Sequence, residues 1–403
     1  MTTYAVAAPR RTLLIVLLGV LTALDAIAID MYLPAMPAMQ QHFSTTSGWV
    51  QASLAIFLIG LAVGQLVYGP IADRYGRRKP LLVGMACFVL GSLLILSADH
   101  IETVLAGRLL QAIGGAAALV IPRAIVADLF EDAQAARVYS MLMLVMGLGP
   151  VLAPSLGGVL AEYFGWQAIF VTLSLFGLLC LAAVLLWVEE SLPSQLRNRD
   201  SLLRSMRGYL RLLDDPHYRR YTWIISLFCA SLFTYISGVP FVLIELYGLS
   251  PAHFGLLFAA NAVGMCMLSF LNIQLLRRFR AEHLLLAGGV LHLGFLLPLL
   301  LVQFFAASQL TSILLLSGAV CSLGLVWGNA MSLVMQGQQA QAGRASALVG
   351  VAQYVLASLA GVALGLLSGR GAWPMFVLMT LIAGLALYGL RHAVAPERSQ
   401  PSG

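Results

Sequence analysis

Apolar stretches of about 20 residues recur from one end of this chain to the other, and they leave it few folds to adopt. A helix of that length spans the hydrocarbon core of a bilayer, which is roughly 30 Å thick. Of the 403 residues, 60% are hydrophobic and only 10% are charged. A soluble domain is nearer about 25% charged. The sequence therefore predicts an all-α polytopic membrane protein.

Twelve such helices can be placed along the chain. They are expected near residues 12–33, 49–70, 81–98, 103–127, 137–161, 167–188, 221–246, 253–275, 283–305, 309–333, 344–368 and 373–391. A polar stretch separates the sixth helix from the seventh. It divides the chain into an N-terminal six-helix bundle (1–188), a cytoplasmic linker (189–220) and a C-terminal six-helix bundle with a short tail (221–403). Within the linker, arginines alternate with apolar residues at helical spacing over 201–213, which is typical of an amphipathic helix on a membrane surface.

The distribution of lysine and arginine predicts the orientation. With the N-terminus placed in the cytoplasm, 20 of the 23 basic residues fall in cytoplasmic segments and only Arg370 falls in an outer loop. The other two, Arg108 and Arg123, lie inside the fourth predicted helix. Because cytoplasmic loops carry the excess of basic residues, we expect both termini in the cytoplasm. The scatter of these charges over many loops argues against a nucleic-acid partner.

Several functional classes lack their sequence signatures. We find no phosphate-binding P-loop, no metal-ligand spacing and no serine elbow, so we expect no enzyme activity and no cofactor, with a proton gradient as the energy source. A channel is disfavoured because no ring-forming selectivity sequence is present, and single-channel currents would revive that alternative. Turnover in detergent, without separated compartments, would revive a membrane enzyme.

One charged loop lies between the second and third predicted helices, in the segment 69–80. Such a cluster cannot lie in hydrocarbon and predicts a tight aqueous turn. It resembles the signature loop of the major facilitator superfamily, with matches at Gly69, Asp73, Arg74, Gly76, Arg77 and Arg78. The resemblance implies two six-helix halves and a gating loop. We expect Asp128 to pair with Arg77, in a charged lock that joins the halves on the cytoplasmic side in the outward-open state.

Further segments resemble motifs of the same superfamily. In the fourth helix, Arg108 precedes a run of small residues in which Ala112 replaces the usual glycine. The fifth helix resembles an antiporter signature, with Ala153 in place of a glycine and matches at Gly149, Pro150, Pro154, Gly157 and Gly158. Helix packing without antiport is the alternative for this helix. The segments 29–35, 240–242 and 254–255 resemble the bicyclomycin-resistance (Bcr/CflA) group of bacterial drug exporters. This resemblance implies that the chain lies in a bacterial inner membrane.

Four ionisable side chains fall inside predicted helices, at a cost of roughly 2.5–3.5 kcal/mol each: Asp25, Asp30, Arg108 and Arg123. Asp30 and Arg108 each lie about 6–8 Å inside the outer boundary and can meet if their helices face each other. We expect Asp30 to carry the proton and Arg108 to tune and couple it; a fixed ion pair is the alternative. Asp25, about 7 Å deeper on another face, is a candidate second proton site, a contact for cationic substrates, or a packed carboxylate. Arg123 is a candidate gating or snorkelling residue.

Candidate substrate contacts are polar, aromatic or soft residues inside helices: Tyr32, Met146, Tyr235, Asn261, Trp327 and Asn329. Packing or lipid contact is the alternative for each. The sequence thus predicts a monomeric, proton-coupled secondary transporter in the lipid bilayer, which exports small amphipathic drugs by drug:proton antiport through alternating access. The alternative is a proton-coupled carrier of metabolites such as nucleosides, purines or amino acids.

Overall fold

The computed structural model describes residues 8–130, 132–197, 209, 211–303, 308–367, 369 and 371–394. Within these ranges all regular elements are helical, and twelve helices are long and apolar enough to cross a membrane. The predicted all-α fold is therefore confirmed. Most of the predicted surface helix at 201–213 lies outside the described residues.

The first six spans precede the linker. The first span is built from four short pieces: α1 (Ala8–Thr22), α2 (Leu24–Asp30), the 3-10 turn η1 (Leu33–Ala35) and α3 (Met36–His42). The other five are single helices: α4 (Ser47–Tyr75), α5 (Arg78–Leu96), α6 (Ile101–Leu129), α7 (Asp132–Phe164) and α8 (Gln167–Trp187). A short turn, η2 (Ser194–Leu196), follows them.

The second six spans include two that are irregular. The seventh is α10 (Pro216–Pro240) continued by a π-helical segment, η3 (Phe241–Leu246). The tenth is α13 (Gln309–Ser322), η5 (Leu323–Leu325) and α14 (Trp327–Val334). The remaining elements are α11 (Pro251–Leu275), α12 (Ala281–Val302), η6 (Gln339–Gln341), α15 (Ala342–Leu366) and α16 (Trp373–Val394).

The first span is longer than the sequence predicted. We expected it to end near Pro34, but it continues to His42. Pro34 lies in the first turn of η1, and Pro37 lies in the first turn of α3. Proline is tolerated there because the N–H that it lacks would have no intrahelical acceptor. The two prolines therefore begin new helical pieces instead of ending the span.

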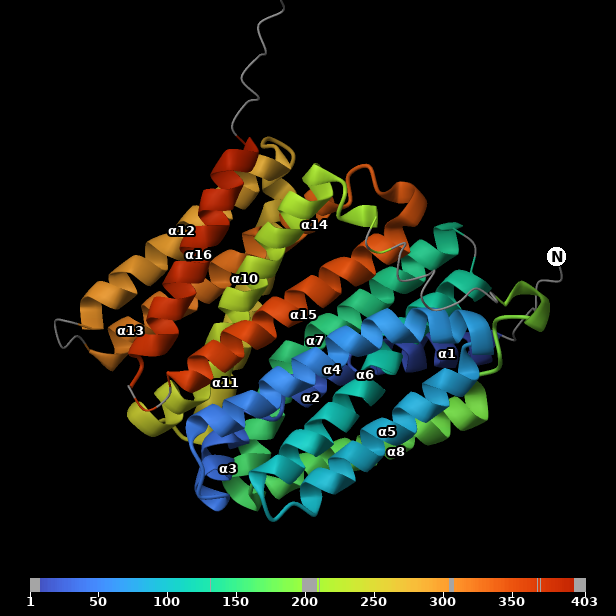
Figure 1. Ribbon diagram of the computed structural model, residues 1–403, viewed down its shortest axis with the longest axis horizontal. Coiled ribbons are helices and arrows are strands. Elements are labelled where there is room, and N and C mark those ends of the chain that lie inside the picture. The colour runs from blue at the N-terminus through green and yellow to red at the C-terminus, as the bar shows by residue number, and fades with distance from the viewer. Residues whose placement is uncertain are drawn as a thin grey trace, which may run out of the picture.

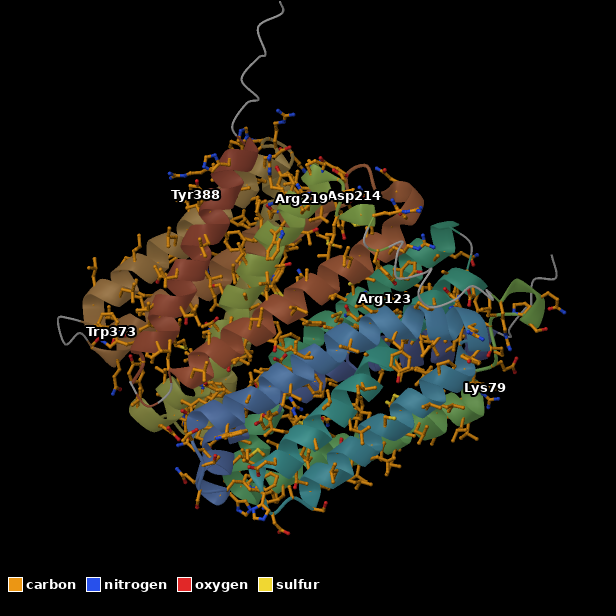
Figure 2. All side chains as sticks on the ribbon, viewed as in Figure 1. Lys79, Arg123, Asp214, Arg219, Trp373 and Tyr388 are labelled. Atoms are coloured by element: carbon orange, nitrogen blue, oxygen red, sulfur yellow. The ribbon has the colours of Figure 1, made fainter. Side chains whose placement is uncertain are left out.

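The spans pack as two groups that meet along two pairs of helices. In Figure 1 the first group, coloured blue to green, lies below and to the right of the second, coloured yellow to red. The main contacts between the groups are α4 with α15 and α7 with α11, and Figure 1 shows α4 and α15 side by side. We call the end where α4 meets α5 the basic end, and the end where α3 meets α4 the opposite end. Figure 2 shows Lys79 and Arg219 at the edge of the bundle, well away from Trp373.

Small residues bring α5 and α6 into close contact. A Cβ atom at Gly91 would lie 2.5 Å from the backbone nitrogen of Gln111, and one at Gly107 would lie 2.9 Å from the carbonyl oxygen of Gly91. Such close approach is typical of packing between membrane helices, where small residues let backbones meet. It holds the Arg108 and Gln111 face of α6 against its neighbours.

Candidate functional site

The first span carries two buried carboxylates on α2. Asp25 lies in the first turn of this seven-residue helix and Asp30 is its last residue. Their exposed fractions are only 2% and 5%. The helix of the first span is interrupted at Ala23, before α2, and again between α2 and η1. These breaks separate α2 from the rest of the span, so its two carboxylates sit on a short element of their own.

Asp25 contacts the second half of the chain. The Tyr354 hydroxyl, on α15, donates a hydrogen bond of 3.4 Å to Oδ2 of Asp25, while Oδ1 has no hydrogen-bond partner among the described residues. Arg123, on α6, lies close enough for its charge to act on Asp25, and Figure 2 places Arg123 within the outline of the bundle. Arg123 is half-buried, and both roles considered for it, gating and snorkelling, stay predictions.

Asp30 has no hydrogen bond or ion pair with any residue that the structure describes. Its charge acts on Tyr235, which lies on α10 in the second half. A nearly buried carboxylate without a counter-charge is an unfavourable anion in a dry site, and binding a proton removes that cost. Asp30 thus lies at the boundary between the halves, where its surroundings change if the halves move.

Arg108 is completely buried on α6. Its Nη1 donates to the carbonyl oxygen of Ala28 at 3.1 Å and to Oε1 of Gln111 at 2.7 Å. The guanidinium carbon lies 4.1 Å from the ring centre of Phe57 and 4.6 Å from that of Tyr32, which are cation–π distances. Its Nε and Nη2 have no hydrogen-bond partners among the described residues.

The described residues form no ion pair between Arg108 and Asp30, so the structure corrects the predicted contact between them. Arg108 does face the first span, but it binds the backbone of Ala28 there. Ala28 lies in the last turn of α2, where carbonyl groups lack intrahelical donors. The break in the span therefore offers the guanidinium an acceptor that an unbroken helix would have used itself.

Among the six candidate substrate contacts, the described hydrogen bonds join only one pair. Tyr235 and Asn261 do meet, by a hydrogen bond of 3.0 Å from the amide of Asn261. Asn329 is instead paired with Asn272, at 2.8 Å, and Tyr32 is fully buried with its hydroxyl 2.7 Å from that of Ser53. Met146 and Trp327 are half-buried.

The signature loop forms a charged cluster within the first half. Arg77 donates to Asp128 from Nε at 2.9 Å, as predicted, and it also pairs with Asp73. Burial alone would lower the pKa of Arg77, but the hydrogen bonds and charges of Asp128 and Asp73 outweigh burial, so this pKa is raised. The side chain of Arg78 donates to the carbonyl oxygen of Leu185 at 2.7 Å.

In this conformation the described ion pairs of the cluster lie within the first half and the linker, so they do not join the two halves. The predicted lock between halves stays a prediction for the outward-open state. Of the other loop residues, Arg74 is exposed and its guanidinium lies 5.5 Å from the ring centre of Tyr75. Gly69 faces the Tyr209 hydroxyl.

Glu190, after the sixth span, is a member of this cluster that the sequence analysis missed. Its carboxylate accepts the backbone N–H of Arg77 at 2.7 Å and that of Arg78 at 3.3 Å. A Cβ atom at Gly76, where φ is +91°, would collide with this carboxylate. The signal that could have found it is the acidic pair at 189–190, directly at the end of an apolar span whose neighbouring loop is basic.

The antiporter-like residues of α7 lie where α7 meets the first span and α11. Gly149 faces the Cβ of Ala26, and a Cβ at Gly157 would collide with the carbonyl oxygen of Met31. Across the boundary between the halves, Gly158 meets the carbonyl oxygen of Pro251 in the same way. Pro154 presents its carbonyl oxygen to Gly255 on α11, whereas Pro150 is half-buried inside α7.

The halves are in direct contact at the opposite end. At the opposite end, Glu162 on α7 accepts the backbone N–H of Ala252 on α11 at 2.9 Å. Farther along the same two helices, a surface hollow of about 600 Å³ separates them. It is lined by Gly147, Leu148, Val151, Val263, Cys266, Met267 and Phe270.

The sequence model of the protein family named Major Facilitator Superfamily matches residues 18–362 of this chain. The chain belongs to the major facilitator superfamily. It is therefore a secondary transporter of small molecules and not an enzyme.

Curated members of the superfamily align with nearly the whole chain. An uncharacterised transporter of Bacillus subtilis, YdgK, is 33% identical, over 94% of this chain and 96% of that protein. A bicyclomycin resistance protein homologue of Haemophilus influenzae is 30% identical, over 93% and 95%. The multidrug resistance protein MdtL of Escherichia coli is 28% identical, over 92% of each.

Solved structures show the same fold. The xylose transporter XylE from E. coli, in a partially occluded inward-open conformation, aligns over 98% of this chain and 100% of that one, with a TM-score of 0.74 and 15% identity. A bacterial homologue of the human lysosomal transporter Spinster, in an inward-facing and occupied conformation, aligns over 96% and 97%, with a TM-score of 0.76 and 16% identity. The predicted major facilitator fold is confirmed.

Proposed function

We propose that this transporter exports small amphipathic drugs in exchange for protons, as a member of the bicyclomycin-resistance group. The observation that carries the proposal is Asp30, a buried carboxylate at the boundary between the halves with no counter-charge among the described residues. Such a group binds a proton when its surroundings are dry and releases it when water enters. The names of the Haemophilus influenzae and Escherichia coli relatives support drugs as the cargo.

Two further features fit an exchange mechanism. Asp25 contacts Tyr354 across the boundary between the halves, so its protonation state can act on the second half. Arg108 has two nitrogen groups without partners among the described residues, so it can accept a new anionic partner in another conformation. We assign proton binding to Asp30, with Asp25 as a second site, and the coupling role to Arg108.

The proposed orientation places both termini and the basic end in the cytoplasm of a bacterial cell, with the opposite end outside. The count of 20 basic residues against 1 supports it. In that orientation the contact between Glu162 on α7 and Ala252 on α11 lies on the outer side. One proton that moves down roughly 100 mV and one pH unit releases about 3.7 kcal/mol, enough for roughly a 500-fold drug gradient.

The test measures ethidium transport by energised inside-out vesicles. Asp30→Asn is compared with the native chain and with Asp99→Asn, an exposed acid at the opposite end. We expect collapse of transport in Asp30→Asn and upon dissipation of the pH gradient, with Asp99→Asn unaffected. Full gradient-driven transport by Asp30→Asn would refute proton binding at Asp30 and move the assignment to Asp25. If the native chain moves no drug, the proposal of drug export is refuted, and the alternative of a proton-coupled metabolite carrier takes its place.

A further inference from the structure

A second, smaller cavity lies between the halves at the opposite end, with a volume of about 210 Å³. In the first half it is bounded by α3 and by the start of α4, and in the second half by η3, the end of α15 and the start of α16. None of the residues assigned above to proton coupling, gating or substrate contact lines it. It is therefore a feature that the proposed function does not use.

One wall of the cavity is the π-helical segment η3. It contributes Phe241, Val242, Glu245 and Leu246 to the lining. Helices of this kind are rare, and they are frequently found at functional sites. The segment begins at Phe241, within the 240–242 stretch that carries part of the resemblance to drug exporters. The unusual backbone and the cavity thus coincide.

The polar groups of the lining lack partners. Gln51 is 4% exposed, and its Oε1 has no hydrogen bond among the described residues. Oε1 of Gln40 is also buried and has no hydrogen-bond partner among the described residues. A buried amide oxygen without a donor is unfavourable and calls for a ligand that supplies one. At the exposed rim, Glu245 has no hydrogen bond or ion pair with the described residues.

The remaining lining is apolar and comes from the second half. Phe241 and Met375 are almost completely buried there, and Leu364 lies beside them. The cavity therefore combines one negative charge at its mouth, unpaired acceptors and an apolar wall. An anion is repelled by the carboxylate, and a purely apolar ligand leaves the amide oxygens unpaired.

We propose that this cavity binds a compact organic amine in its ammonium form. Glu245 supplies the counter-charge, Gln40 and Gln51 accept N–H groups, and Phe241 and Met375 cover the apolar part. The inference rests on the proposed function only in that the amine would be cargo on its way out; binding itself needs no proton gradient. In the proposed orientation the site opens to the outside of the cell.

The test is protection of a thiol in the cavity. Ser47→Cys places a nearly isosteric thiol in the lining, and a membrane-impermeant maleimide labels it in intact cells treated with an uncoupler. The chain without this substitution gives the background from native cysteines. The probes are phenethylamine and its neutral counterpart 2-phenylethanol. We expect phenethylamine to slow labelling about two- to fivefold more than 2-phenylethanol, the range that an exposed ion pair supports.

Variants at the rim decide whether the Glu245 carboxylate causes the stronger protection by phenethylamine. We expect Glu245→Gln to abolish the difference between the two probes and Glu245→Asp to retain part of it. Glu102→Gln, another exposed acid at this end, is the matched control and should retain all of it. Equal protection by both probes, no protection by either, or a difference that survives in Glu245→Gln would each overturn the proposal.

Arg370 lies outside the described residues, between two residues of the lining. We expect Arg370→Ala to preserve the preference for phenethylamine. If the preference appears only in Arg370→Ala, the chain's own guanidinium occupies the site and the proposal fails for the native chain. Because the assay runs without a gradient, protection without any ethidium transport would refute drug export alone, and transport without protection would refute this site alone.

Discussion

The carboxylate of Glu190 accepts the backbone N–H of Arg77 at 2.7 Å, although 113 positions separate the two residues. Its second oxygen accepts the N–H of Arg78, the first residue of α5, at 3.3 Å. The first N–H groups of a helix have no intrahelical acceptors. Glu190 thus caps α5 from a distance, and it fastens the chain that follows the sixth span to the signature loop.

Removal of this cap should destabilise the transporter. We expect Glu190→Ala to lower the free energy of unfolding by about 1 kcal/mol, as for the loss of other helix caps. Thermal unfolding of the purified protein in detergent measures the effect. Glu189→Ala is the matched control, since Glu189 is its exposed neighbour. Equal effects of the two substitutions would show that the hydrogen bonds to Arg77 and Arg78 contribute nothing.

The close approach of Glu190 to Gly76 gives a second prediction. Gly76 has φ +91° and ψ 171°, a combination essentially limited to glycine, and Gly337 has φ +77°, so the backbone strains alanine at both positions and more at Gly76. Nothing lies within 4 Å of a Cβ at Gly337, whereas a Cβ at Gly76 collides with Glu190. We therefore expect Gly76→Ala to destabilise more than Gly337→Ala in the same unfolding assay.

A double-mutant cycle isolates the collision. In a Glu190→Ala background the excess cost of Gly76→Ala over Gly337→Ala should shrink, because the collision with Glu190 is gone and only the difference in backbone cost remains. An excess that is unchanged in that background would assign it to the backbone or to some other neighbour of Gly76.

The hydrogen bond from Tyr354 to Asp25 joins the halves near a candidate proton site. Tyr354→Phe removes the hydroxyl and keeps the ring. We expect drug transport to slow by about two- to tenfold, in line with the net value of one hydrogen bond, and its pH profile to shift. Tyr388→Phe is the control, because Tyr388 is 67% exposed on α16. An unchanged rate and pH profile in Tyr354→Phe would remove Tyr354 from the coupling.

Closure of the opposite end depends on Gly158. A Cβ there would collide with the carbonyl oxygen of Pro251 on α11, so Gly158→Ala should penalise the closed arrangement. We expect spin-label distances between the opposite-end termini of α7 and α11 to lengthen in this variant. Gly147→Ala, on the same helix with nothing within 4 Å, should leave them unchanged. It should also stabilise α7 by about 1 kcal/mol, the usual gain of alanine over glycine. Unchanged distances in Gly158→Ala would show that the contact does not control closure.

The sequence by itself determined the twelve spans and the kinds of residue in the signature loop. A bilayer makes this possible, because every backbone polar group in hydrocarbon must be satisfied within its own helix, so local hydropathy suffices to locate the spans. The sequence also identified Asp25, Asp30 and Arg108 as residues that need an explanation, since a charged side chain at membrane depth is costly whichever way it points. Where the first span breaks was less accessible: Pro34 predicted its end, yet it begins the next helical piece.

Only the tertiary structure decided which groups meet. Arg108 binds the carbonyl oxygen of Ala28, 80 positions away, rather than Asp30, because the break after α2 leaves that carbonyl available. Asp25 meets Tyr354, 329 positions away, only because α15 packs against the first half. Hydropathy fixes the depth of a side chain but not the rotation of its helix or the identity of its neighbour. Those follow from packing between helices, which no local stretch of sequence specifies.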